Sequence, residues 1–266
     1  MTELPTWVPD GINVKLPSAA RVYDYLLGGG HNFAVDRVVG EKVLQVLPNG
    51  GQIAGSNRAF LRRAVLYMVE QGITQFLDLG SGIPTVGNVH EVAQDADPAC
   101  RVVYVDYDEV AVAHSQLLLK GNDNATVVAA DFCQPETVLT APAVTGLLDF
   151  SQPIGLLLVA VFHFVADEKD PRGVVARYRD ALPPGSLVAL SHLTADQKAT
   201  EMAAVVEAMK SSRDPMYFRP YDEVVALFEG LELVEPGVVS APQWRPESGC
   251  YDVGPEDVYA GVGYKR

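Results

Sequence analysis

The chain has 266 residues, a length that can bury a sizeable core and that suits one α/β domain with an added segment. Its 34 acidic and 20 basic residues give a formal charge of −14, which opposes binding to nucleic acid phosphates and to anionic membranes. We therefore expect a small-molecule partner, neutral or partly cationic, and neither a nucleic acid nor a membrane.

Cysteine usage and the first residues indicate the compartment. Cys100, Cys133 and Cys250 are odd in number and far apart, so they indicate neither a disulfide framework nor a zinc site. The start of the chain lacks a basic segment followed by an apolar run, and no apolar stretch approaches the roughly 18 residues of a membrane span. These patterns predict a soluble protein of a reducing cytoplasm.

Two helices are expected near the start of the chain. Residues 20–27, ARVYDYLL, form a short amphipathic pattern that three consecutive glycines, 28–30, bring to an end. Asn32 is a suitable N-cap for a second helix over residues 33–47. Because each glycine loses backbone entropy on ordering, three in tandem suggest a special role for this corner.

A longer helix and then an α/β alternation follow. Ser56 is expected to cap a helix over residues 57–71, which Gly72 stops. Beyond it, short β-branched runs alternate with helical segments, which is typical of an α/β fold, here with about seven strands. The apolar run at 154–162 suits a central parallel strand that is covered on both faces. The expected strands are 75–79, 101–106, 126–131, 154–165, 185–193, 231–235 and 257–264, and the expected helices include 86–94, 109–119, 173–182 and 221–230.

The segment FLDLGSGIP, residues 76–84, carries the first chemical motif. Its strand brings Asp78 close to a glycine turn at the carboxyl edge of the sheet, where open α/β folds bind ligands. Gly80 and Gly82 would let a ligand touch the backbone of this turn. A compact strand-to-helix turn without any ligand is the alternative interpretation of two glycines.

Two later strands end in a carboxylate at the same edge. Asp106 ends the second strand, where an acidic side chain can accept hydrogen bonds from both hydroxyls of a ribose. Asp131 ends the third strand, where a carboxylate can take an adenine amino group while Phe132 packs on the ring. The three strand ends together predict a nucleoside site.

The turn does not favour a dinucleotide. A dinucleotide site usually has a third glycine, and Thr85 stands at that position, preceded by Pro84. Asp78 would also lie close to a pyrophosphate, and two like charges about 4 Å apart repel by about 4 kcal/mol at an effective dielectric constant of 20. S-adenosylmethionine carries a sulfonium and an ammonium group, so an acid at this turn favours it as the ligand.

The sequence resembles the class I S-adenosylmethionine-dependent methyltransferases, and within them an actinobacterial-type group once catalogued as a domain of unknown function. The resemblance implies a Rossmann-like, seven-stranded sheet, mostly parallel with the last strand antiparallel, and S-adenosyl-L-methionine as methyl donor. It also implies donor binding by the three carboxylates and the glycine turn. The chain differs from the group at Cys133, where an arginine is usual, and at Gly30, where a lysine is usual. The resemblance is carried by residues 17–37, 57–65, 75–94, 102–115, 130–136, 156–171, 185–192, 231–239 and 244–247.

The N-terminal glycine corner then has a candidate role. Residues 1–55 are expected to form a helical lid that folds across the carboxyl edge of the sheet, and residues 56–266 the donor-binding methyltransferase domain. A cover of this kind would exclude water and strengthen the electrostatics inside. A helical hairpin with a flexible corner is the alternative. The residues expected to bind the donor are Asp78, Gly80, Ser81, Gly82, Asp106, Tyr107, Asp131, Phe132 and, from the lid, Tyr23, Gly28, Gly29 and Asn32.

Methyl transfer needs little from side chains, because the sulfonium is a good leaving group and in-line positioning supplies most of the acceleration. A base is required only if the acceptor must lose a proton. His163, near the end of the fourth strand, is the candidate base, and His192, after the fifth, is the second choice. His90 and His114 are expected to be structural or exposed.

Two further clusters have weaker functional interpretations. Arg62 and Arg63 could reach the donor carboxylate or the lid, although an exposed charged face fits them better. Asp24, His31 and Asp36 could form a metal site, but no second histidine is placed nearby, so no metal is expected.

The acceptor is expected to be a small molecule whose identity the sequence does not give. Its choice would be set by the lid, residues 134–153 and residues 194–230, where SSRDPMYFRPY could line a pocket or be a packed loop. Two rival functions stay open. One is a protein that binds S-adenosylmethionine or S-adenosylhomocysteine without catalysis, and the other is a nicotinamide-dependent oxidoreductase.

Overall fold

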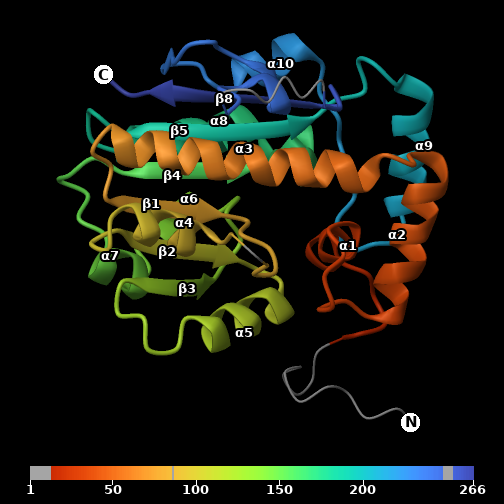
Figure 1. Ribbon diagram of the computed structural model, residues 1–266, viewed down its shortest axis with the longest axis horizontal. Helices are drawn as coiled ribbons and strands as arrows, with labels where there is room; N and C mark the ends of the chain where they lie inside the picture. Colours follow the sequence, from red (N-terminus) through yellow and green to blue (C-terminus); the bar gives the residue numbers. More distant parts are fainter. Residues whose placement is uncertain (1–12, 86, 248–253) are drawn as a thin grey trace.

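The computed structural model describes residues 13–85, 87–247 and 254–266, and one mixed sheet forms its centre (Figure 1). The strand order is β3-β2-β1-β4-β5-β8-β6, and β7 pairs with β8. β1 to β5 are parallel, and β8 is antiparallel to β5, β6 and β7. The expected α/β fold is confirmed, with one strand more than predicted. The strands are β1 Gln75–Leu79, β2 Arg101–Asp106, β3 Ala125–Ala129, β4 Gly155–Val159, β5 Leu187–Leu193, β6 Glu232–Leu233, β7 Val239–Ser240 and β8 Val258–Tyr264.

Helices cover both faces of the sheet because its central strands are buried on both sides. Consecutive residues of one strand, such as Phe76 and Leu77 in β1, point to opposite faces and enter two different apolar clusters, one on each face. In Figure 1 the long helix α3 crosses the front face of the sheet over β4 and β5, and α8 lies behind the sheet. The helices are α1 Ala19–Leu26, α2 Ala34–Val46, α3 Gly50–Glu70, α4 Val89–Ala96, α5 Glu109–Leu118, α6 Pro135–Leu139, α7 Pro142–Leu147, α8 Pro171–Ala181, α9 Ala199–Met209 and α10 Tyr221–Ala226.

The glycine corner ends α1 in the expected way. Gly28 adopts a left-handed φ of +78°, its N–H donates to the Tyr25 carbonyl, and the Gly29 N–H donates to the Asp24 carbonyl. These two bonds form a Schellman motif, in which glycine avoids the steric cost of the left-handed conformation. Gly28 is therefore required by the helix end itself.

Two expected helix starts are wrong. Asn32 does not cap α2: Phe33 occupies the N-cap, and its N–H donates to the Asp36 carboxylate at 2.8 Å. α3 starts at Gly50, so Ser56 lies inside it rather than at its cap. The glycines at 50, 51 and 55 disfavour a helix locally, and burial of Ile53 outweighs them.

Two further expectations concern the boundary at residues 55/56 and the length of the fourth strand. The expected boundary at 55/56 falls within α3, and the division into a lid and a methyltransferase domain stays a prediction. The expected strand 154–165 is also too long, because β4 ends at Val159 and Ala160 turns the chain with a left-handed φ of +58°.

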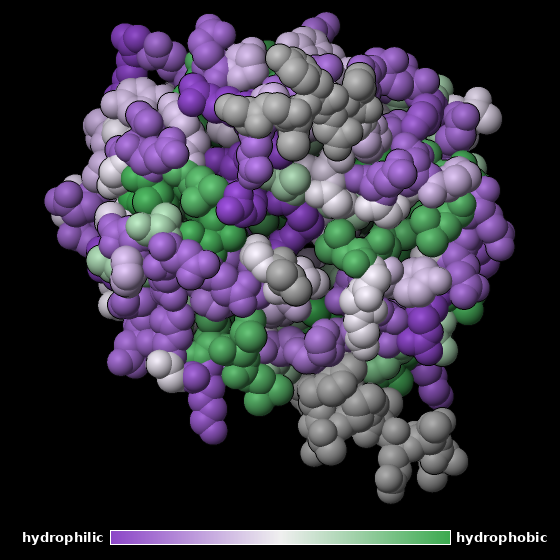
Figure 2. Space-filling model, viewed as in Figure 1, coloured by the Kyte–Doolittle hydropathy of each residue, from purple (hydrophilic) through white to green (hydrophobic). Residues whose placement is uncertain are grey.

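The surface carries mainly hydrophilic residues, as expected for a strongly charged chain. The face drawn in Figure 2 is largely hydrophilic, with apolar patches that are separated from one another. Within the ranges that the structure describes, no helix combines the length and the apolarity needed to cross a membrane.

Candidate active site

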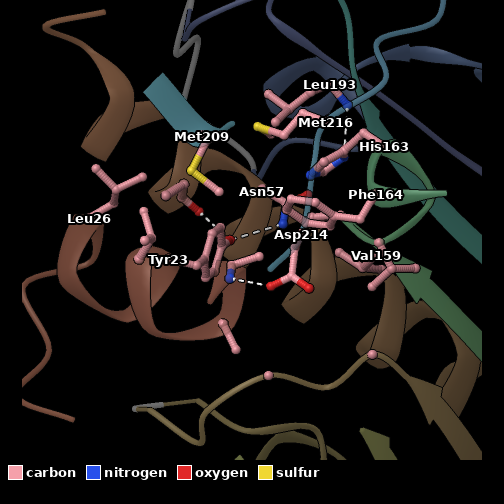
Figure 3. A pocket seen from close by; sticks show the side chains of 18 of the residues that line it. Tyr23, Leu26, Asn57, Val159, His163, Phe164, Leu193, Met209, Asp214 and Met216 are labelled. Carbon is pink, nitrogen blue, oxygen red and sulfur yellow. Dashed lines mark hydrogen bonds between the residues drawn. The ribbon is translucent and has the colours of Figure 1, made fainter. Parts of the chain in front are cut away.

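A cavity of about 190 Å³ opens at the carboxyl ends of β1, β2 and β4 (Figure 3). The helices α1, α2 and α9 gather beyond these strand ends in Figure 1, and residues of all three, together with α3, line the cavity. The cavity is therefore at the edge of the sheet where the sequence predicts a nucleoside site. The predicted site residues that line it are Tyr23, Asp78, Gly80, Ser81, Gly82, Asp106, Tyr107, Phe132 and His163.

The glycine turn after β1 is fixed to the neighbouring strand by its own backbone. The N–H groups of Gly80 and Ser81 donate to the Val105 carbonyl at 2.8 and 3.1 Å, and the Gly82 N–H donates to the Asp106 carboxylate at 2.7 Å. Gly80 has a φ of +67°, and a Cβ atom there would lie 2.4 Å from Cγ1 of Val161. Glycine at position 80 is therefore needed both for the backbone conformation and for the close approach of Val161, two residues after β4.

Two carboxylates lie buried side by side around this turn. Burial raises the pKa of Asp78 to about 7, although the positive charge of Arg58 opposes this rise. Burial likewise raises the pKa of Asp106 to about 6, against hydrogen bonds from the backbone N–H groups of Asp108 and Gly82. Each acid therefore changes charge readily near neutral pH, and a cation in the cavity would hold both in the ionised form.

The third predicted carboxylate is not part of the cavity lining. Asp131 accepts a hydrogen bond from the Cys133 N–H at 2.8 Å, and its other oxygen is 4.0 Å from Nζ of Lys169. Its neighbour Phe132 does line the cavity and packs on Phe162, with ring centroids 5.5 Å apart. The strand end thus presents the aromatic ring to the cavity and the carboxylate to the outside.

The glycine corner after α1 also lies outside the cavity lining. A Cβ atom on Gly29 would lie 2.0 Å from Oδ1 of Asp24, and the side chain of Asn32 donates to Asp24 at 2.8 Å. Gly28, Gly29 and Asn32 therefore hold the shape of the corner around Asp24 rather than facing the cavity. His31 packs on His114, with ring centroids 3.9 Å apart. The described part of the chain contains no cluster of side chains that could hold a metal ion.

A series of hydrogen bonds links the end of the sheet to α1 through side chains beside the cavity. The Ala160 N–H donates to Ser191 Oγ at 2.9 Å, and this hydroxyl donates to Asn57 Oδ1 at 2.6 Å. Asn57 Nδ2 donates in turn to the Tyr23 hydroxyl at 3.0 Å, which donates to the Ala54 carbonyl at 3.1 Å. Sequence reasoning missed Asn57, whose only signal is a polar residue on the apolar face of a helix.

His163 lines the cavity but is held as a neutral ring. It is 2% exposed, and burial, with the nearby His192 and Arg219, keeps its pKa well below the ordinary histidine value. Its Nδ1 atom accepts a hydrogen bond from the Leu193 N–H at 3.5 Å, so Nε2 carries the proton of the neutral ring. The second choice, His192, is outside the cavity lining, and burial lowers its pKa to about 4.

The other two histidines and the two arginines are tied to structure. His90 shares a hydrogen bond of 2.7 Å with the Tyr104 hydroxyl. Arg62 pairs with Glu247 at 3.0 Å, and Arg63 donates to the Trp244 carbonyl at 2.9 Å, so neither arginine lines the cavity. Arg58, one turn earlier on α3, lines it instead.

A second polar network, which sequence reasoning did not foresee, closes the cavity beside β2. The Asp214 carboxylate accepts hydrogen bonds from the Ala19 N–H at 2.6 Å and from the Tyr107 hydroxyl. Arg213 lies over the Tyr107 ring, 4.4 Å from its centroid, and pairs with Asp108 at 3.4 Å. The segment after α9 thereby connects the start of α1 to the end of β2.

Parallel strands flanked by an antiparallel β8, a glycine turn after β1 and an acid at the end of β2 define a class I S-adenosylmethionine-dependent methyltransferase. The chain belongs to the S-adenosyl methyltransferase family, whose family model matches residues 5–266. It is thus an enzyme of the methyltransferase class, and its methyl donor is S-adenosyl-L-methionine. No curated protein sequence matches the chain significantly.

Two solved structures are similar over almost the whole chain. A candidate methyltransferase of Thermobifida fusca is 38% identical, with a TM-score of 0.93 over 98% of this chain and 100% of its own. A DUF574 family protein of Streptomyces avermitilis is 37% identical, with a TM-score of 0.91 over 95% of this chain and 99% of its own. An O-methyltransferase family protein of Burkholderia thailandensis shares the fold alone, at 11% identity, a TM-score of 0.53 and coverage of 82% of this chain and 60% of its own.

Proposed function

We propose that the enzyme transfers the methyl group of S-adenosylmethionine in line to a small-molecule acceptor bound in the same cavity. A lone pair of the acceptor forms the new bond to the methyl carbon, and the carbon–sulfur bond breaks with its electron pair left on sulfur. The product on the donor side is S-adenosylhomocysteine. The observation that carries this proposal is the continuity of the cavity, which runs from the glycine turn to the helices α1, α2 and α9.

The donor site is proposed at the strand ends. Asp78 would face the cationic part of the donor, and Asp106 would accept hydrogen bonds from the ribose hydroxyls. The aromatic rings of Tyr107 and Phe132 would lie on either side of the adenine, because both line the cavity beside Asp106. Asp131 would reach the adenine amino group only from the rim.

The lid is proposed to act through α1 rather than through its glycine corner. Tyr23 is the predicted lid residue that lines the cavity, and it is anchored to α3 by its bonds to Asn57 and Ala54. Gly28, Gly29 and Asn32 support the lid by shaping its corner. α1 and α2 would then keep water out of the cavity while the donor is bound.

His163 stays the proposed catalytic side chain, with a role narrower than that of a strong base. A lowered pKa makes the ring uncharged at neutral pH and a weak proton acceptor. With Nδ1 accepting from the Leu193 N–H, the geometry favours Nε2–H as a hydrogen-bond donor to the acceptor molecule. A positioning role of this kind suits in-line transfer, which depends on alignment.

The proposal also covers the type of acceptor and the location of the enzyme in the cell. The net charge of −14 supports a small molecule rather than a nucleic acid as the acceptor. A cytoplasmic location is supported by Cys100 and Cys133, which are free thiols.

A panel of ligands tests the proposal. S-adenosylmethionine and S-adenosylhomocysteine should each stabilise the folded protein, by about 2.7 kcal/mol at 100 times the dissociation constant, whereas NAD and NADP should not. Stabilisation by S-adenosylhomocysteine together with transfer of labelled methyl groups to a small-molecule extract supports the enzyme. Donor binding without transfer to any fraction of the extract favours the non-catalytic binding protein instead.

A further inference from the structure

One side of the cavity, which we call the apolar half, is built from helices rather than from strand ends. It is represented by Leu26 of α1, Val43 of α2, Ile53 of α3, Met202 and Met209 of α9, and Met216 beyond it. All of these except Leu26 are buried. In Figure 3, Leu26 and Met209 lie toward one end of the space and Val159 toward the other, while Met216 lies next to His163.

Charged side chains are gathered on the opposite side. In the described chain, the charged residues of the cavity lining lie at the ends of β1 and β2 or are coupled to residues there. Arg213 pairs with Asp108 at 3.4 Å, Asp214 binds Tyr107, and the charge of Arg58 acts on Asp78. A charged ligand in the apolar half would therefore lose its hydration without gaining a counter-charge, which is strongly unfavourable.

The Tyr23 hydroxyl is a neutral polar group on a side chain that lines the cavity. The Tyr23 hydroxyl donates its proton to the Ala54 carbonyl and accepts one hydrogen bond from Asn57. A hydroxyl oxygen has two lone pairs, so it can accept one further hydrogen bond. The Tyr23 hydroxyl thus matches a ligand that carries a neutral donor, such as a hydroxyl group.

The three methionines indicate the shape of the ligand body. Thioether side chains are flexible and polarizable, and they make favourable contacts with aromatic rings. Met202, Met209 and Met216 come from one helix and the segment after it, so they can adjust together around a flat ring.

We propose that the apolar half binds the methyl acceptor, and that this acceptor is an uncharged aromatic compound whose one hydroxyl-type donor faces the Tyr23 oxygen. The inference rests on the proposed function, because it places the acceptor beside a donor at the strand ends.

The test uses three naphthalenes of matched size: neutral 2-naphthol, anionic 2-naphthoate and cationic 2-naphthylmethylammonium. Their affinities for the full chain are measured by calorimetry at pH 7.5 with saturating S-adenosylhomocysteine, which fills the donor side. 2-Naphthol should bind at least about tenfold more tightly than both charged compounds. The net charge of −14 alone would rank the cation above the anion, so weaker binding of both reports on the cavity itself.

Two neighbouring substitutions locate the binding. Leu26→Trp fills the apolar half and should weaken 2-naphthol at least about tenfold while S-adenosylhomocysteine keeps its affinity within about twofold. Leu27→Trp, at a half-buried position outside the cavity lining, should leave both affinities within about twofold.

The possible failures are distinguishable. If S-adenosylhomocysteine binds and either charged compound matches 2-naphthol, or if Leu26→Trp has no effect on 2-naphthol, the assignment of the acceptor class is wrong. If S-adenosylhomocysteine does not bind to the unaltered chain, the proposed function fails instead, whatever the naphthalenes do.

Discussion

The two halves of the cavity are built in different ways. The half at the strand ends is held by main-chain hydrogen bonds, such as those from Gly80 and Ser81 to Val105, and it carries the charges. The apolar half is formed by side chains of α1, α2, α3 and α9 and by Met216 beyond α9. A site of the first kind recognises one ligand by fixed geometry, whereas a site of the second kind recognises a shape and can change by substitution. We therefore expect the donor side to tolerate little variation and the acceptor side much more.

The largest effect is expected where the two regions are joined. Arg21 of α1 is buried and pairs with Asp36 at 2.9 Å and with Asp108 at 3.2 Å. Arg21→Met would leave two buried acids without this cation, so the free energy of unfolding in urea should fall by about 3–5 kcal/mol. Arg37→Met, at an exposed position of α2, is the matched control and should cost less than about 1 kcal/mol. Equal losses in the two variants would mean that Arg21 does not connect the regions.

A smaller effect is expected within the half of the cavity at the strand ends, which we call the polar half. Asp106→Ala removes the acceptor of two backbone N–H groups and of the proposed ribose contact, so the affinity for S-adenosylmethionine should fall by about 30- to 100-fold. Asp131→Ala should cost about threefold or less, because its carboxylate lies outside the cavity lining. Titration calorimetry of both variants measures the difference. A larger loss at Asp131 would move the donor site toward β3.

His163, which lines the cavity, gives the third prediction. If Nε2–H orients the acceptor, His163→Gln, which keeps a donor, should retain kcat/KM within about fivefold, while His163→Ala should lose about 30-fold. Once an acceptor is known, steady-state kinetics over pH 6 to 9 make the comparison. A glutamine variant as slow as the alanine variant, with loss of a titrating group from the pH profile, would show that His163 is a base.

The smallest predicted effect concerns the charge of the polar half. Burial raises the pKa of Asp78 to about 7, and the ammonium group of S-adenosylmethionine favours the ionised form. Affinity should therefore rise about tenfold from pH 6 to pH 8, as the ionised fraction grows from about one-tenth to about nine-tenths. 5′-Methylthioadenosine, which lacks the amino acid part, should change about twofold or less. A flat profile for both ligands would place Asp78 away from the ammonium group.

The polar half could be predicted from the sequence because its signals are local. Asp78, Gly80 and Gly82 lie within five consecutive residues, and the run of β-branched residues before Asp106 marks the end of β2. Periodicity fixes which residues end a strand, and parallel strands bring these ends together. The fold class followed from the same alternation, although β7, at two residues, is too short to leave a pattern.

The apolar half could not be predicted in this way. Leu26 and Met209 both line the cavity, although they are far apart in the chain, and α2, which follows α1, packs on α9. Asn57 and Asp214 owe their roles to partners at Ser191 and Ala19, which no local pattern relates to them. The start of α3 was misplaced for a similar reason, because tertiary burial overrides the low helix propensity of its glycines.

The continuity of α3 bears on how the proposed lid would move. Its 21 residues form one rod of about 31 Å that carries Ile53 of the apolar half at one end and is packed on the sheet along the rest. A hinge at residue 55 would break helical hydrogen bonds, so a lid movement of the proposed kind would bend at the turn over residues 47–49, between α2 and the rod. Opening there would break the bonds of Tyr23 to Asn57 and Ala54 of α3, and also the contacts of Ala19 with Asp214 and of Arg21 with Asp108. A set of polar contacts, rather than a single bond, would therefore hold the proposed lid closed.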